Sequence, residues 1–151
     1  MENINSEQDL LFLIKYLNKL LAMDFDKRLG EYDLTGSQGR LLFYLNKKVF
    51  IEGEVIHQND IEKRFGLSKS TVSSLVDRLA KKELIERVND KPFVSLVPTE
   101  KGRCIVNHFH NTHEQTIEKL TSGLDKTAVE NMISNIKLLI KNLEKEEEDV
   151  K

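Results

Sequence analysis

Short hydroxyl side chains crowd one segment of this sequence, SKSTVSS, which begins at Ser68. Hydroxyl groups both donate and accept hydrogen bonds, and small side chains at the start of a helix allow close approach to base edges and phosphates. An ordinary packed surface helix is the alternative, but such a helix more usually carries Glu and Lys at these positions. The residues that we expect to contact bases or phosphates directly are Ser68, Lys69, Ser70, Thr71, Ser73 and Ser74.

These side chains need a helix to position them, and the apolar residues of the same segment predict one. Val72, Leu75, Val76 and Leu79 recur at the spacing of a single helical stripe, and the hydroxyl residues fall on the opposite face. The segment therefore predicts an amphipathic helix with its polar face toward a ligand.

A shorter helix is predicted just upstream, over residues 59–65, with Ile61 and Phe65 as its buried pair. Gly66 is the kind of turn residue found after a helix C-terminus, and Ser68 is a good N-cap for the next helix. A helix, a short turn with Gly and a second helix together form a helix-turn-helix.

Two short apolar runs, residues 84–88 and 93–97, predict a hairpin beyond the second helix. Its tip would be the segment Asn89-Asp90-Lys91-Pro92, and Thr99 would cap a further helix. A helix-turn-helix followed by a two-stranded hairpin is a winged helix.

Two cations and one ion pair are expected around this wing. We expect Arg78 and Lys91 to reach the backbone of the DNA, with Lys91 at the charged tip of the wing. Asp77 would fix the wing in place by pairing with Arg87.

The order of the motifs DLTGSQGRLLFYL, QNDIEKRFGLSKSTVSSLVDRLAKKELIERV and PTEKGR resembles the MarR family of bacterial winged-helix regulators. The resemblance extends over nearly the whole chain. It implies an obligate homodimer that binds a pseudo-palindromic operator, usually represses transcription, and releases the DNA on meeting a small ligand, an oxidant or a metal.

The chain departs from the family pattern at three places in or beside the wing. The family's Asp-x-Arg is matched by Asp90, Lys91 and Pro92, so the wing lacks the Arg that reaches the DNA, and the wing is also short. Its DNA contact is therefore expected to be weaker or different. Glu83 stands where Gly usually follows the recognition helix, and a left-handed conformation there would cost about 1 kcal/mol. Pro98 is expected to end the second strand abruptly.

Composition fits a single domain over residues 1–151, mainly α-helical, with a winged-helix lobe at 36–98 and dimerisation helices at 1–30 and 100–147. The chain is 32% charged and 39% hydrophobic, and it has neither a membrane-length apolar run nor a signal peptide, so we expect it in the cytoplasm.

The net charge of −2 is unevenly distributed along the chain. Between Gln58 and Arg103, ten Lys and Arg outnumber seven Asp and Glu, whereas the rest of the chain has a balance of −5.

Apolar stripes at both ends of the chain favour a homodimer. The alternative is that the two end helices pack on each other within one chain. A long helix predicted over residues 100–120 would connect the wing to the dimer region as a rigid rod. The first stripe consists of Leu10, Leu13, Ile14, Leu17, Leu20, Leu21 and Phe25, and the second of Val129, Met132, Ile133, Ile136, Leu139, Ile140 and Leu143.

In the family, effectors bind between the first helix, the helix predicted here over residues 36–45 and the long helix that follows the wing. The resemblance gives five candidates for such a pocket: Tyr16, Met23, Arg40, Tyr44 and Phe109. Arg40 would suit a small aromatic or anionic ligand, such as a carboxylate or a phenolate. The alternative is that Arg40 pairs with an acid such as Asp33 and that the others belong to the core.

Other chemistry has weaker support. His108, His110 and His113 lie on one predicted helix, but further metal ligands are missing, so no metal site is expected. Cys104 is the only cysteine and is expected to be a packing residue. The sequence contains no phosphate loop or nucleophile motif, so neither an enzymatic activity nor a cofactor is expected. A metal- or oxidant-sensing regulator and a protein-interaction scaffold remain as alternatives, the latter because the wing lacks its Arg.

Overall fold

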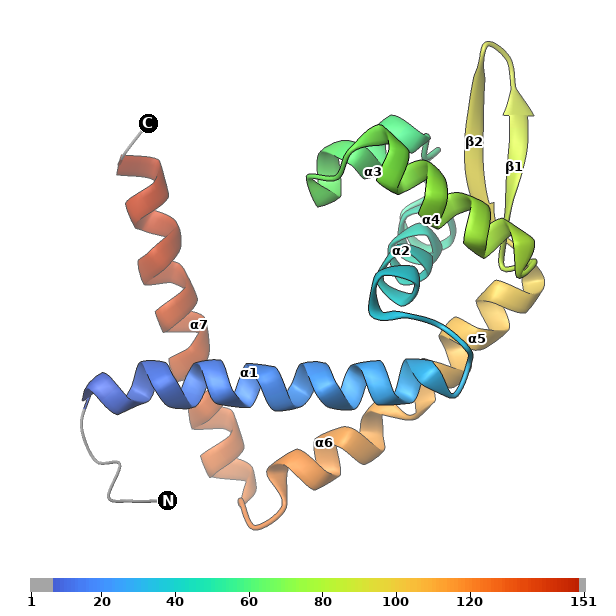
Figure 1. The fold of residues 1–151 in the computed structure, drawn as a ribbon. Helices are drawn as coiled ribbons and strands as arrows, with labels where there is room; N and C mark the ends of the chain where they lie inside the picture. Colours follow the sequence, from blue (N-terminus) through green and yellow to red (C-terminus); the bar gives the residue numbers. More distant parts are fainter. Residues whose placement is uncertain (1–6, 150–151) are drawn as a thin grey trace. The chain divides into compact units, whose positions relative to one another are not determined.

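The computed structural model describes residues 7–149, and they form a mainly helical fold with one two-stranded antiparallel sheet (Figure 1). The chain divides into two compact units, one ending at Asn111 and the other beginning at Thr112. The elements are α1 (Glu7–Gly30), α2 (Gly36–Asn46), the π-helical turn η1 (Lys47–Ile51), α3 (Gln58–Phe65), α4 (Lys69–Lys81), β1 (Ile85–Asp90), β2 (Phe93–Pro98), α5 (Glu100–Asn111), α6 (His113–Thr121) and α7 (Lys126–Asp149).

The core of the first unit is built around α2. Leu41, Leu42 and Leu45 of this helix are buried, and side chains from the end of α1, from α3 to α5 and from the wing pack in the same cluster. The stripe predicted for α4 has its expected place, because Val72, Val76 and Leu79 are buried and Leu75 is partly buried against the same cluster. Burying this stripe leaves the hydroxyl face of α4 outside.

The helix-turn-helix has the predicted caps. Gly66 adopts a left-handed conformation with φ of 63° at the end of α3, and its N–H donates to the carbonyl of Glu62. Ser68 is the N-cap of α4, and its Oγ accepts a hydrogen bond from the N–H of Thr71 at 3.3 Å. Ile61 is buried, and Phe65 is half-buried. The turn therefore fixes the direction in which α4 starts.

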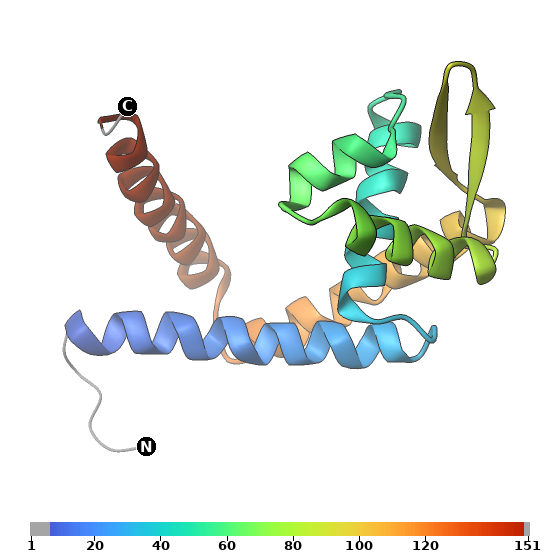
Figure 2. The same ribbon diagram turned by 45° about the horizontal axis from the view of Figure 1, so that its top comes forward.

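The wing is an antiparallel hairpin that stands out from the rest of the first unit in both views (Figures 1 and 2). Its register pairs Ile85 with Pro98 and Asp90 with Phe93, so only Lys91 and Pro92 form the turn. The predicted four-residue tip is thus shorter, because Asn89 and Asp90 continue the first strand. Strand β2 ends at Pro98, as predicted.

Glu83 takes the left-handed conformation that the sequence pointed to, with φ of 60°. It lies in the turn between α4 and β1, and its carbonyl accepts a hydrogen bond from Thr99 Oγ1 at 2.6 Å. This bond ties the strained turn to the start of α5.

The long helix expected over residues 100–120 is interrupted, which corrects the prediction of a single rigid rod. Helix α5 ends at Asn111, and α6 begins at His113, with Thr112 between them. Asn and Thr are weak helix formers because their side chains compete for backbone hydrogen bonds. The two residues together therefore account for the break between α5 and α6.

The apolar stripes of α1 and α7 are exposed in the single chain. Large side chains on α1 such as Leu13, Ile14 and Leu17 are accessible, and so are Ile133, Ile136 and Ile140 of α7. Phe25 and Val129 are exceptions: Val129 is half-buried, and Phe25 is partly buried against Phe109 with ring centroids 5.3 Å apart. None of the helices between residues 7 and 149 is long and apolar enough to cross a membrane.

Candidate nucleic-acid interface

The N-terminal half of α4 presents a hydroxyl-rich surface. Lys69, Ser70, Thr71 and Ser74 are exposed, whereas Ser73 is half-buried. Ser68 Oγ lies 2.9 Å from Thr71 Oγ1 and 3.2 Å from Ser70 Oγ, so these three hydroxyl groups form one small network. Ser68 therefore has a structural role as a cap, which leaves Lys69, Ser70 and Thr71 as the most accessible donors.

Helix α3 supports this end of α4 across the turn. The side-chain amide of Gln58 donates to the carbonyl of Lys69 at 3.4 Å. The bond joins the first residue of α3 to the first residue of α4, and it leaves the ammonium group of Lys69 exposed.

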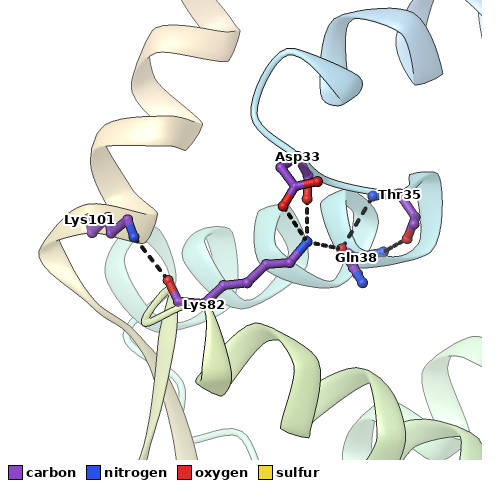
Figure 3. Close-up of polar contacts among 5 residues, drawn as sticks. All are labelled: Asp33, Thr35, Gln38, Lys82 and Lys101. Atoms are coloured by element: carbon purple, nitrogen blue, oxygen red, sulfur yellow. Dashed lines mark hydrogen bonds and ion pairs between the residues drawn. The ribbon is translucent and has the colours of Figure 1, made fainter.

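A second set of contacts, which the sequence analysis missed, holds the other end of α4 (Figure 3). Lys82 directly follows α4, and its Nζ donates to Gln38 Oε1 at 3.0 Å and to the carbonyl of Asp33. Gln38 is almost completely buried and forms a capping box with Thr35 at the start of α2. Lys101 Nζ of α5 donates to the carbonyl of Lys82 at 3.1 Å. We call this set the Lys82 brace; it joins α4, α2 and α5.

One local signal pointed toward the brace. The spacing of Thr35 and Gln38 is that of a capping box at the start of α2. Nothing near Lys82 in the sequence indicates a partner more than forty residues away. Asp33 lies 3.6 Å from Lys82, so this acid pairs with Lys82, in place of the pairing with Arg40 considered from the sequence.

The wing is attached to α4 by the predicted ion pair between Asp77 and Arg87. Arg78 is exposed on the same helix, and Lys91 is exposed at the turn of the wing. Because Arg87 is engaged with Asp77, Lys91 is the cation that the wing turn presents to solvent.

A further attachment joins the wing to the start of α3. His57 forms an isolated antiparallel bridge with Ser95, and its ring packs edge-on against Phe93 with centroids 5.5 Å apart. The N–H of Leu96 donates to the carbonyl of Ile56 at 2.8 Å. The sequence analysis did not single out His57 or Phe93, since their contact depends on how the hairpin packs.

The five residues proposed for an effector pocket lie at several places in the single chain. Tyr16 stacks on Phe12 of the same helix, and Met23 is exposed. Phe109 is fully buried with the guanidinium of Arg28 4.3 Å from its ring, and Tyr44 packs edge-on against Phe65.

Arg40 lies at a separate cavity of about 200 Å³ between α2, α3 and α4. Its lining is otherwise Ser37, Leu41, Ile61, Phe65, Leu67 and Leu75. Within the described part of the chain, the guanidinium of Arg40 has no hydrogen-bond or ion-pair partner. Arg40 is exposed to solvent, and a mainly apolar cavity beside an exposed cation suits a small anionic ligand with an apolar body.

The histidines and the cysteine occupy other positions. His108 Nδ1 lies 2.9 Å from the hydroxyl of Tyr32, and the ring of His110 packs near Phe43. Over the described residues, no group of three or more metal-ligating side chains comes together. Cys104 is exposed on α5, which corrects the expectation that it packs inside, because α5 buries the face of Val106 and Phe109 instead.

An ion-pair network around Lys48 stabilises the π-helical turn after α2, and it shifts the pKa values of Lys48 and Glu52. Lys48 Nζ donates to Glu52 at 2.6 Å and to Glu54 at 3.3 Å. The hydrogen bond from Lys48 holds the pKa of the Glu52 carboxyl below its usual value, and the same bond raises the pKa of Lys48. These groups lie outside the surface formed by α4 and the wing.

Comparison with known proteins finds similar winged-helix regulators. A model described as MarR family matches residues 32–92. MepR, a transcription regulator of the multidrug efflux pump MepA of Staphylococcus aureus, is 28% identical with a TM-score of 0.75, over 92% of this chain and 99% of MepR. A MepR–DNA complex is 26% identical with a TM-score of 0.63, over 94% and 99% of the two chains. MarR of E. coli in its apo form is 22% identical with a TM-score of 0.72, over 86% and 95% of the two chains, and it shares the fold.

LexA repressors of Staphylococcus aureus are 31% identical over 101 residues, which is 66% of this chain and 49% of the repressor. The chain thus spans about half the length of the curated relatives it matches.

Proposed function

We propose that this chain is a transcriptional regulator of the MarR family that binds double-stranded DNA, because a MarR-family model matches residues 32–92 and MepR shares its fold. It acts as a homodimer on a pseudo-palindromic operator, with one α4 in each half-site. The observation that carries the proposal is the exposed start of α4, where Lys69, Ser70 and Thr71 face solvent on a helix fixed at both ends.

Two further observations support this function. The structure of a relative, MepR, is described in complex with DNA. The positive charge of the chain is concentrated between Gln58 and Arg103, the stretch that contains α3, α4 and the wing. A balance of +3 per lobe is modest, so few phosphates are contacted and the affinity falls as salt rises.

We further propose that the regulator is a repressor released by a small aromatic or anionic effector. The unpaired Arg40 and its apolar cavity support an anionic ligand. Two of the other four candidate pocket residues, Tyr16 and Met23, lie on α1. The apolar side chains of α1 are exposed, and a second chain would cover them. They remain candidates for a pocket that forms in the dimer.

Fluorescence anisotropy tests DNA binding directly. The duplex comes from upstream of the protein's own coding region, an unrelated duplex of equal length is the control, and both are titrated at low and physiological salt. We expect selective binding that weakens with salt. Lys69→Glu should lower the affinity at least about tenfold, because each half-site loses a cation and gains a repelling charge. Lys119→Glu makes the same change on α6 and should bind as the wild type does.

A protein-interaction scaffold is the second candidate, and the observation in its favour is the wing, which has no Arg at its turn. A scaffold would bind both duplexes weakly and equally, and Lys69→Glu would behave like Lys119→Glu. That pair of results would overturn the regulator proposal.

A further inference from the structure

We propose that the wing inserts an apolar wedge, with Phe93 as its leading side chain, between base pairs from the minor groove. The wing would then select operators by how easily they deform. This inference rests on the proposed function and adds how the wing takes part in recognition.

The wing exposes large apolar side chains, and of these Phe93 is covered only in part, by the ring of His57. Phe93 is 63% exposed, Val94 45% and Val88 41%, although the core residues of the same winged helix are at most 5% exposed. Phe93 and Val88 share one face of the hairpin, and Val94 lies on the other. Exposed apolar side chains gathered in one place mark interaction sites. Phe93 is the largest of the three, and it is the first residue after the turn.

The chemistry of the wing turn excludes most other ways of contacting DNA. The minor groove presents mainly acceptor atoms, so reading its edges requires donors. Pro92 has no N–H, Phe93 has no side-chain donor, and Arg87 is held by Asp77. Lys91 is left as the side-chain cation at the described turn. Apart from the ammonium group of Lys91, shape and stacking are therefore the recognition modes that this turn can supply.

The wing is also held firmly enough to act as a wedge. His57 packs edge-on against Phe93 and bridges to Ser95, and the N–H of Leu96 donates to Ile56 at 2.8 Å. These contacts fix β2 to the start of α3, while Asp77 fixes β1 to α4. Because the hairpin is ordered before binding, inserting Phe93 sacrifices little conformational freedom.

The same attachments favour DNA over a protein as the partner. Asp77 joins the wing to α4 next to Arg78, so the apolar turn and the hydroxyl surface of α4 belong to one continuous part of the first unit. Apolar wedges that enter the minor groove unstack base steps and kink the duplex. The pyrimidine–purine steps TA and CA/TG are the easiest base steps to unstack and kink in this way.

Selection from a pool of duplexes with a random core tests the wedge. The wild type, Phe93→Ala, Phe93→Tyr and Phe50→Ala are each used to enrich binding sequences from that pool. The control Phe50 is also an exposed phenylalanine, but it lies in η1, where its ring packs against the guanidinium of Arg103. We expect the wild type, Phe93→Tyr and Phe50→Ala to enrich a TA or CA/TG step at two symmetric outer positions. The Phe93→Ala pool should keep the half-sites read by α4 and lose that step.

Two measurements on the selected duplex complete the test. Phe93→Ala should lower the affinity about tenfold with the same dependence on salt, since a stacking contact carries no charge. Lys91→Met should instead reduce the slope of log affinity against log salt by about two, because each of the two wings of the dimer loses one phosphate contact. With 2-aminopurine at the enriched step, fluorescence should rise on binding the wild type and not on binding Phe93→Ala. Melting curves check that each variant is folded.

The outcomes separate the wedge from the proposed function. If the wild type enriches half-sites and Phe93→Ala enriches the same sequences with equal affinity, the wedge is wrong while DNA binding stands, and the apolar turn is then a surface for another protein. If the wild type enriches no sequence, both the regulator proposal and the wedge are overturned.

Discussion

Gly102 marks the closest approach between α5 and the start of the wing. A Cβ atom at this position would overlap the backbone carbonyl of Leu84, which cannot move aside as a flexible side chain can. The same carbonyl accepts a hydrogen bond from the N–H of Thr99 at 3.0 Å. Absence of a side chain at residue 102 is therefore what lets α5 pack under the hairpin.

Gly102→Ala should destabilise the protein by about 1–3 kcal/mol, because the overlap outweighs the better helix propensity of Ala. Gly30→Ala is the matched control, since a Cβ there meets no atom within 4 Å. The control should be neutral or slightly stabilising. Urea denaturation measures both variants, and equal stabilities would show that the backbone adjusts at Gly102 without cost.

At the scale of elements, the Lys82 brace positions α4. The carboxylate of Asp33 is nearly fully exposed, so its ion pair with Lys82 contributes little. The hydrogen bonds to the Asp33 carbonyl and to the buried Gln38 amide carry most of the stabilisation. They fix the end of α4 relative to α2, and hence the direction of the whole helix.

Lys82→Met should lower stability by about 1–2 kcal/mol, because the buried oxygen of Gln38 loses a charged donor. DNA affinity should also fall when it is measured well below the melting temperature. Nearly all of the variant is folded there, so the fall reports a misplaced α4 and not unfolding. Lys81→Met removes the same charge from the preceding, exposed residue and should leave stability almost unchanged. If Lys82→Met is as stable as Lys81→Met and binds DNA as tightly, the Lys82 brace does not position α4.

At the scale of the whole molecule, the exposed stripes of α1 and α7 require a partner. Side chains such as Leu17 and Ile136 still expose 42% and 47% of their surface, so burying the rest would contribute on the order of 1 kcal/mol each. Many such side chains follow one another on each helix. A second copy of the chain, which we propose as the partner, would supply matching surfaces and also the second α4 for a symmetric operator.

Sedimentation should therefore give a mass of about 35 kDa for the wild type, twice the 17.5 kDa of one chain. Ile136→Glu places a charge in the stripe of α7 and should shift the mass toward one chain. Lys141→Glu, on the polar face of the same helix, should leave the dimer intact. A wild type that sediments as a single chain at micromolar concentration would contradict the dimer.

Local signals in the sequence were sufficient for the parts of the fold that depend on residues close together in the chain. The left-handed Gly66, the Ser68 cap and the stripe from Val72 to Leu79 all follow from interactions within a few residues. The same is true of the strained Glu83, whose conformation is set by the turn in which it lies. The winged helix and the surface of α4 were predictable for this reason.

Tertiary structure alone decided the contacts that join distant segments. Lys82 reaches Gln38 and Asp33, His57 packs against Phe93, and neither pair has a periodicity or a spacing that reveals it. Packing likewise decided that Cys104 faces solvent, because α5 turns its other face to the core. Such contacts depend on the angles at which whole elements meet, and those angles follow from the combined packing of many side chains.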